Sequence, residues 1–133
     1  MNETLSTFEK KWLTQDIRLV RKDLSLVEAA IAYDLMQCAI ALHKSTNNKK
    51  YTHIKRHALR SFCKQIGVRS HKTTAGSLTV NQIRSFINNV HNNGVLPDSI
   101  KTLQIDTIIR FIYFLVINNI LDHNVYDRTK YDL

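Results

Sequence analysis

Residues 52–67, THIKRHALRSFCKQIG, separate into two faces when they are placed on an α-helix. One face is apolar and recurs every four residues: Ile54, Ala58, Phe62 and Ile66, with Leu59 and Cys63 beside them. The other face is cationic at the same spacing: His53, Arg56, His57, Arg60 and Lys64. Thr52 is a candidate N-cap and Gly67 a candidate residue for the helix end. The pattern predicts an amphipathic helix that packs on a core and exposes a row of cations.

Helical periodicity extends over most of the chain on either side of this segment. We predict further helices over about residues 6–23, 26–44 and 79–93, and a last one from Asp98 to about Leu121. Three of the starts have capping-box form: Ser6-x-x-Glu9, Ser25-x-x-Glu28 and Thr79-x-x-Gln82. The helix over 79–93 is expected to bury five residues: Val80, Ile83, Phe86, Ile87 and Val90.

The composition agrees with a helical fold. The chain has 133 residues, 44% of them hydrophobic, with only one Pro and three Gly to interrupt helices. We therefore expect an all-α fold, a single compact domain of about five helices over 1–133 that forms a small helical bundle. Residues 108–117 are rich in β-branched and aromatic side chains, so a strand is the alternative there. The tail, about residues 123–133, is expected to be loosely held.

Positive charge is concentrated in one part of the sequence. Residues 35–97 contain ten Lys/Arg, five His and no acidic residue, whereas each flank has a net charge of −1, which together give the overall +8. The basic region covers residues 44–84. Exposed basic side chains often serve solubility alone, but solubility does not require the exclusion of every carboxylate. A polyanionic partner favours such exclusion, and nucleic acid is the most common polyanion.

The candidate nucleic-acid-binding residues lie on the amphipathic helix, on the loop around residues 68–77, and on the next helix. Hydroxyl residues in that loop are also suited to phosphate contacts. The set is Lys49, Lys50, His53, Lys55, Arg56, His57, Arg60, Lys64, Arg69, His71, Lys72 and Arg84. Exposed aromatic residues are few among them, which favours a duplex or structured nucleic acid over a stacked single strand.

A helix-turn-helix-like corner is a further possibility near residues 79–105, where a turn around Gly94 joins two predicted helices. Ser99, Lys101, Thr102 and Gln104 would then include the groove-facing side chains. Asn89 and Asn93, however, occupy positions where apolar packing residues are usual. An ordinary helix–loop–helix connection is therefore the favoured interpretation.

Metal and catalytic sites have little support. His53 and His57 share a helix face, but Cys63 lies on another side and no CxxC motif completes a ligand set. The sequence has no glycine-rich phosphate loop, no HExxH and no GxSxG motif. We expect no catalytic residues, no metal and no cofactor, and hence a protein that is not an enzyme.

The sequence thus predicts a non-catalytic nucleic-acid-binding protein, with DNA slightly favoured over RNA. It would act as a transcriptional regulator or as a small helical subunit of a nucleoprotein complex. The alternative is a protein-interaction adaptor or inhibitor whose basic face docks an acidic partner protein. Residues 26–44 are apolar almost all round, so this helix is either central to the core or part of an oligomer interface. We expect a homo-oligomer, most simply a dimer, formed through this helix or through the last one. Two cysteines and no long apolar run predict a cytoplasmic, reducing location without membrane association.

Overall fold

The helices begin and end close to the positions that the sequence predicts. The computed structural model describes residues 24–43, 49–66 and 74–131. Within these ranges the fold is all-α, as expected, with a short 3-10 helix, η4 (Ala75–Ser77). The five α-helices are α2 (Leu26–His43), α3 (Lys49–Ile66), α4 (Val80–His91), α5 (Asp98–Ile117) and α6 (His123–Tyr131). The helix predicted over 6–23 lies outside the described residues.

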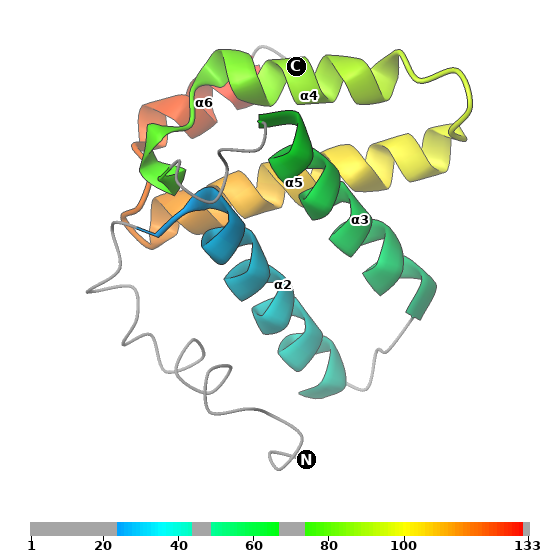
Figure 1. The fold of residues 1–133 in the computed structure, drawn as a ribbon, viewed down its shortest axis with the longest axis horizontal. Coiled ribbons are helices and arrows are strands. Elements are labelled where there is room, and N and C mark those ends of the chain that lie inside the picture. Colours follow the sequence, from blue (N-terminus) through cyan, green and yellow to red (C-terminus); the bar gives the residue numbers. More distant parts are fainter. Residues whose placement is uncertain (1–23, 44–48, 67–73, 132–133) are drawn as a thin grey trace.

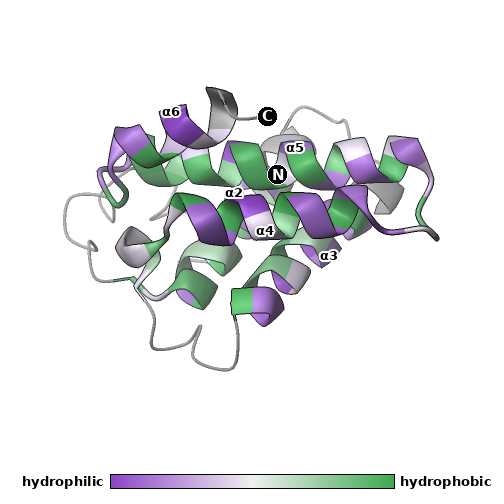
Figure 2. Cartoon of the chain, turned by 90° about the horizontal axis from the view of Figure 1, so that it is seen from above, coloured by the Kyte–Doolittle hydropathy of each residue, from purple (hydrophilic) through white to green (hydrophobic). Residues whose placement is uncertain are grey.

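The long helix α5 organises the bundle. α2 and α3 run in opposite directions and both cross α5, while α4 runs alongside α5 (Figure 1). α6 packs against α4 and α5. Green and purple residues alternate along α4 in Figure 2, as expected of a helix with one apolar and one polar face. No helix in the described ranges is long and apolar enough to cross a membrane.

The capping boxes predicted at Ser25 and Thr79 are both present, whereas the one predicted at Ser6 lies outside the described residues. The Ser25 backbone N–H donates to Glu28 Oε1 (3.1 Å), and the Glu28 N–H donates to Ser25 Oγ (3.2 Å). Thr79 and Gln82 make the same reciprocal pair at the start of α4, at 3.0 and 3.2 Å. Each box supplies acceptors for backbone N–H groups that a helix start leaves unpaired, so α2 and α4 begin where predicted.

Aromatic side chains fill the centre of the core. Phe62 of α3 is fully buried and meets Phe86 of α4 and Phe111 of α5 edge-on, with ring centroids 5.3 and 6.4 Å apart. Ala58 is buried with it, and Ile66 and Cys63 pack partly buried against the same core. All five residues predicted to be buried on α4 are buried. The apolar face of α3 is thus confirmed, and it fixes which face of α3 points outward.

The structure differs from the sequence prediction at two places, the start of α3 and residues 123–131, and it confirms the predicted helix at residues 108–117. α3 begins at Lys49, so Thr52 lies inside the helix and is not its N-cap. Residues 108–117 belong to α5, which settles the choice between helix and strand. Residues 123–131 are helical instead of loosely held, because α6 packs on α4 and α5 and buries Thr129 to 1% exposure.

The connection between α4 and α5 is an ordinary helical hairpin. Asn93 Oδ1 accepts hydrogen bonds from the backbone N–H groups of Val95 and Leu96, at 2.8 and 3.0 Å, and so closes the turn. The two helices run side by side in nearly opposite directions (Figures 1 and 2), unlike the steep crossing of a helix-turn-helix unit. Gln104, which a groove-reading helix would expose, is buried.

Candidate nucleic-acid interface

Contacts on both flanks of α3 determine which of its residues remain open. On one flank, Arg56 Nε donates to Asp34 Oδ2 of α2 at 2.9 Å. On the other flank, Asn89 Nδ2 of α4 donates to Gln65 Oε1 at 3.0 Å. The core-facing side packs on α5. The remaining face of α3 carries four exposed residues, which we call the α3 stripe: His53, His57, Arg60 and Lys64.

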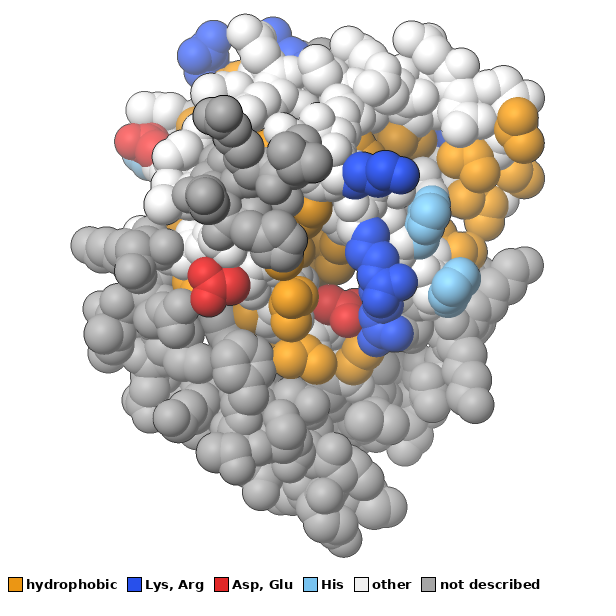
Figure 3. All heavy atoms as spheres, in the orientation of Figure 1, with side chains coloured by type: hydrophobic (Ala, Val, Ile, Leu, Met, Phe, Trp, Pro, Cys, Tyr) orange, Lys and Arg blue, Asp and Glu red, His pale blue; other side chains and the backbone are white. Residues whose placement is uncertain are grey.

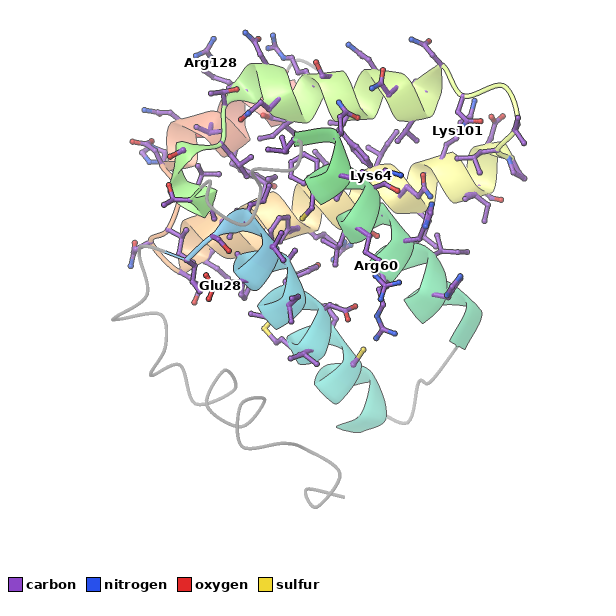
Figure 4. The ribbon with its side chains drawn as sticks, viewed as in Figure 1. Glu28, Arg60, Lys64, Lys101 and Arg128 are labelled. Atoms are coloured by element: carbon purple, nitrogen blue, oxygen red, sulfur yellow. The ribbon has the colours of Figure 1, made fainter. Side chains whose placement is uncertain are left out.

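The α3 stripe is a nearly straight row of cationic or titratable side chains. Its residues follow one another at intervals of four, three and four, which keeps them on one side of the helix over roughly 16 Å. Figure 3 shows Lys/Arg and His side chains gathered over α3, and Figure 4 labels Arg60 and Lys64 on successive turns. Among the described residues of α3 there is no acidic side chain.

Within the stripe, the two full charges are accessible. Neither Arg60 nor Lys64 forms an ion pair or side-chain hydrogen bond within the described part of the chain. His57 Nε2 lies 3.4 Å from Ser61 Oγ, a contact along the same helix. By contrast, Arg110 on α5 is paired with Asp106 at 2.8 Å, and Lys101 Nζ donates to the His91 carbonyl at 3.0 Å. Arg60 and Lys64 therefore differ from Arg56 and Arg110, whose charges are balanced by Asp34 and Asp106.

Arg56 belongs to the α2–α3 contact instead of the stripe. Besides the Asp34 ion pair, its NH2 group donates to Cys38 Sγ at 3.3 Å. The hydrogen bond and charge of Asp34 raise the pKa of the Arg56 guanidinium further above its ordinary value, so it stays charged under all ordinary conditions. The Asp34 side chain is only 17% exposed. Asp34 therefore balances the charge of Arg56, although the Arg56 side chain is 40% exposed.

Lys55 and Arg84 also lie away from the stripe. Lys55 is half-buried and stands four and seven residues before the buried Leu59 and Phe62, which places it on the core-facing side of α3. Arg84 is half-buried on α4, five residues before Asn89. Since Asn89 faces α3, that spacing turns Arg84 toward the other side of α4. The structure thus does not bring these two predicted residues together with Arg60 and Lys64.

The other candidate residues are only partly placed. Lys49 and Lys50 form the first turn of α3, which extends the helix beyond the stripe, but their side chains are not described. Arg69, His71 and Lys72 lie outside the described residues. Of the twelve candidates, the stripe residues are the ones that the structure places on a common exposed face.

Both cysteines of this region are partly buried thiols. Cys63 is half-buried against the core, and burial raises the pKa of its thiol to about 11, which disfavours the reactive thiolate. In the described part of the chain no group of three or more His, Cys, Asp or Glu side chains is arranged to hold a metal ion.

One feature of this region was not predicted. A pocket of about 460 Å³ lies between α2 and α3, next to the stripe, and Arg60 is part of its lining. Ile31 of α2 and Leu59 of α3 contribute apolar surface to it. The pocket depends on how two helices pack, and neither helix shows it by its own sequence pattern.

Comparisons with known proteins add no relative to this description. No family model, curated protein or solved structure matches the chain.

Proposed function

We propose that the protein binds nucleic acid without catalysis through the α3 stripe, acting as a transcriptional regulator or as a small helical subunit of a nucleoprotein complex. The observation that carries the proposal is the pair of exposed, uncompensated cations on successive turns, Arg60 and Lys64. Their helix is anchored by a buried apolar face, so the charges are presented on a rigid support. Such a row suits the phosphate backbone, whose condensed counterions are released when Lys or Arg replaces them.

The geometry supports contacts to phosphates more than contacts to base edges. The stripe is short, and its side chains are two full cations and two imidazoles. It lies on a helix packed on both flanks, whereas base readout needs a helix that can enter a groove. We infer a binding mode governed by charge and shape, with duplex DNA slightly favoured over RNA.

Self-association is part of this proposal, because one stripe of two full charges would hold a duplex only weakly. On the side of α5 opposite its buried residues, Tyr113 and Ile117 are 49% and 53% exposed. Tyr113 also packs against Tyr126 of α6 in a tilted arrangement, with ring centroids 5.3 Å apart, which gives this surface a second element. A dimer formed through this face would carry two stripes.

The test is a salt series of binding to labelled duplex DNA and to RNA of matched length. We expect log-linear weakening with rising salt in the wild type. The variant Arg60→Glu/Lys64→Glu should lose binding to both polymers while it keeps its helical circular dichroism. The matched control is Arg110→Glu/Arg128→Glu, which changes the net charge equally on α5 and α6.

Two results would overturn the proposal. One is the absence of binding to either polymer at low salt, which would direct attention to an acidic partner protein. The other is an equal loss in the stripe and control variants, because net charge and not the stripe would then govern binding. Self-association is tested separately by sedimentation of the wild type and of Tyr113→Glu/Ile117→Glu, which should be monomeric. A wild-type monomer at all concentrations would remove the dimer from the proposal.

A further inference from the structure

The pocket between α2 and α3 has the size of a small-molecule site. Its volume of about 460 Å³ lies within the range of roughly 300–1,000 Å³ that ligand pockets usually have. It is open to solvent on the side of the molecule that carries the stripe. The two helices that form it are bridged at this point by the Asp34–Arg56 ion pair, at 2.9 Å.

The surface of the pocket is mainly apolar. The buried Leu59 lines it, and Cys63 contributes a thiol that burial keeps protonated, with a pKa raised to about 11. Ile31 of α2 lines the same pocket and is still 52% exposed, which is unusual for so large an apolar side chain. An apolar group seated here would cover Ile31 and remove that surface from water.

The charged groups around the pocket leave a net positive charge. Asp34 and Arg56 both line it, but they compensate each other at 2.9 Å. Arg60 lines it too, and has no ionic partner in the described part of the chain. A guanidinium next to apolar surface is well suited to a carboxylate or phosphate group, which it can bind with two parallel hydrogen bonds.

We propose that this pocket binds a small amphipathic anion, with an apolar body over Ile31, Leu59 and Cys63 and a carboxylate or phosphate head on Arg60. The class includes medium-chain fatty acids and apolar organic phosphates, which share this chemistry. The apolar part of the pocket is separate from the α3 stripe, but Arg60 belongs to both the pocket and the stripe.

The shared residue has a regulatory consequence, which rests on the proposed nucleic-acid function. An anion bound at Arg60 neutralises one of the two full charges of the stripe. Nucleic acid and the amphipathic anion therefore compete, and the ligand lowers the affinity for nucleic acid without any change of fold.

The experiment measures binding of dodecanoate and of dodecanol, both below their aggregation limits, by titration calorimetry on the full chain without nucleic acid. Wild type should bind dodecanoate saturably at one site. Arg60→Gln should weaken dodecanoate about tenfold, as expected for loss of one charge-assisted contact, and leave dodecanol unchanged. Ile31→Gln should weaken both compounds. Lys64→Gln is the matched control: it removes the neighbouring charge of the stripe, lies outside the pocket lining, and should affect neither compound.

Three outcomes would overturn the proposal: no saturable binding of dodecanoate, equal binding of the acid and the alcohol, or a loss in Lys64→Gln as large as in Arg60→Gln. Repeating the titration with dodecyl phosphate shows whether the site prefers a phosphate or a carboxylate head group. Competition between dodecanoate and duplex DNA is then measured in the wild type and in Ile31→Gln. If dodecanoate binds but DNA does not, the proposed ligand site is supported, and only the proposed nucleic-acid function is contradicted.

Discussion

Arg56 and Arg60 stand one helical turn apart on α3, yet their surroundings differ. Arg56 reaches toward α2, where Asp34 and Cys38 accept its hydrogen bonds and Asp34 balances its charge. Arg60 lies at the edge of the α2–α3 pocket with an exposed side chain and no ionic partner in the described part of the chain. The comparison teaches that a basic sequence overstates the charge available to a partner, because part of that charge holds the bundle together.

The strongest test of this comparison is to remove the apolar face that supports both arginines. Phe62→Ala empties the space between Phe86 and Phe111 at the centre of the core. The free energy of unfolding should fall by about 3–5 kcal/mol, as for other buried Phe-to-Ala changes. Urea denaturation followed by circular dichroism measures it. A loss below about 1 kcal/mol would mean that α3 is not anchored through Phe62.

The second test addresses Arg56 by removing its partner. Asp34→Asn leaves Arg56 without its counter-charge in a partly buried contact, and should lower the free energy of unfolding by about 1 kcal/mol. A double-mutant cycle with Arg56→Gln isolates the coupling between the two side chains. Additive effects in that cycle would show that the ion pair contributes nothing to the α2–α3 contact.

The third test uses the pH dependence of stability at the pocket-facing thiol. The ordinary pKa of 9.0 applies to Cys63 in the unfolded chain, whereas burial raises the pKa to about 11 in the folded protein. Between these values the unfolded state holds fewer protons, so stability falls as pH rises. Wild type should lose about 1 kcal/mol more than Cys63→Ala between pH 8 and pH 10. If the free energy of unfolding changed with pH in the same way in the wild type and in Cys63→Ala, the burial of this thiol would be contradicted.

The smallest effect is expected on the stripe itself. Lys64→Ala removes an exposed side chain without a partner among the described residues, so the free energy of unfolding should change by less than about 0.5 kcal/mol. The same urea titration measures it. A loss of 1 kcal/mol or more would show that Lys64 supports the fold, and its place in a binding surface would need another explanation.

Local patterns predicted the helices well, because they follow from backbone hydrogen bonds and periodicity within a few residues. The pairs Ser25 with Glu28 and Thr79 with Gln82 fixed two helix starts, and both boxes are present. Helix α6 was missed because its sequence is largely polar. Its order comes from packing Thr129 and its neighbours on α4 and α5, which no local pattern reveals.

The exposed cationic surface of α3 was predicted less completely, for a related reason. Spacing correctly placed Arg60 and Lys64 on one face of α3. It also placed Arg56 there, because the partner of Arg56 lies 22 residues away in the sequence, and a pairing over that distance depends on how α2 and α3 meet. The pocket depends on the same contact. The packing of α2 against α3 must therefore be known before the cations that are paired within the protein can be told from those that are open to a partner.

The central claim is that Arg60 is available to a polyanion and Arg56 is not. It is tested most directly by the salt dependence of duplex DNA binding in Arg60→Gln and Arg56→Gln, both checked for intact helical circular dichroism. We predict that Arg60→Gln reduces the slope of log affinity against log salt by about 1, one phosphate contact, and that Arg56→Gln leaves the slope unchanged. An equal or larger reduction in Arg56→Gln would contradict the account.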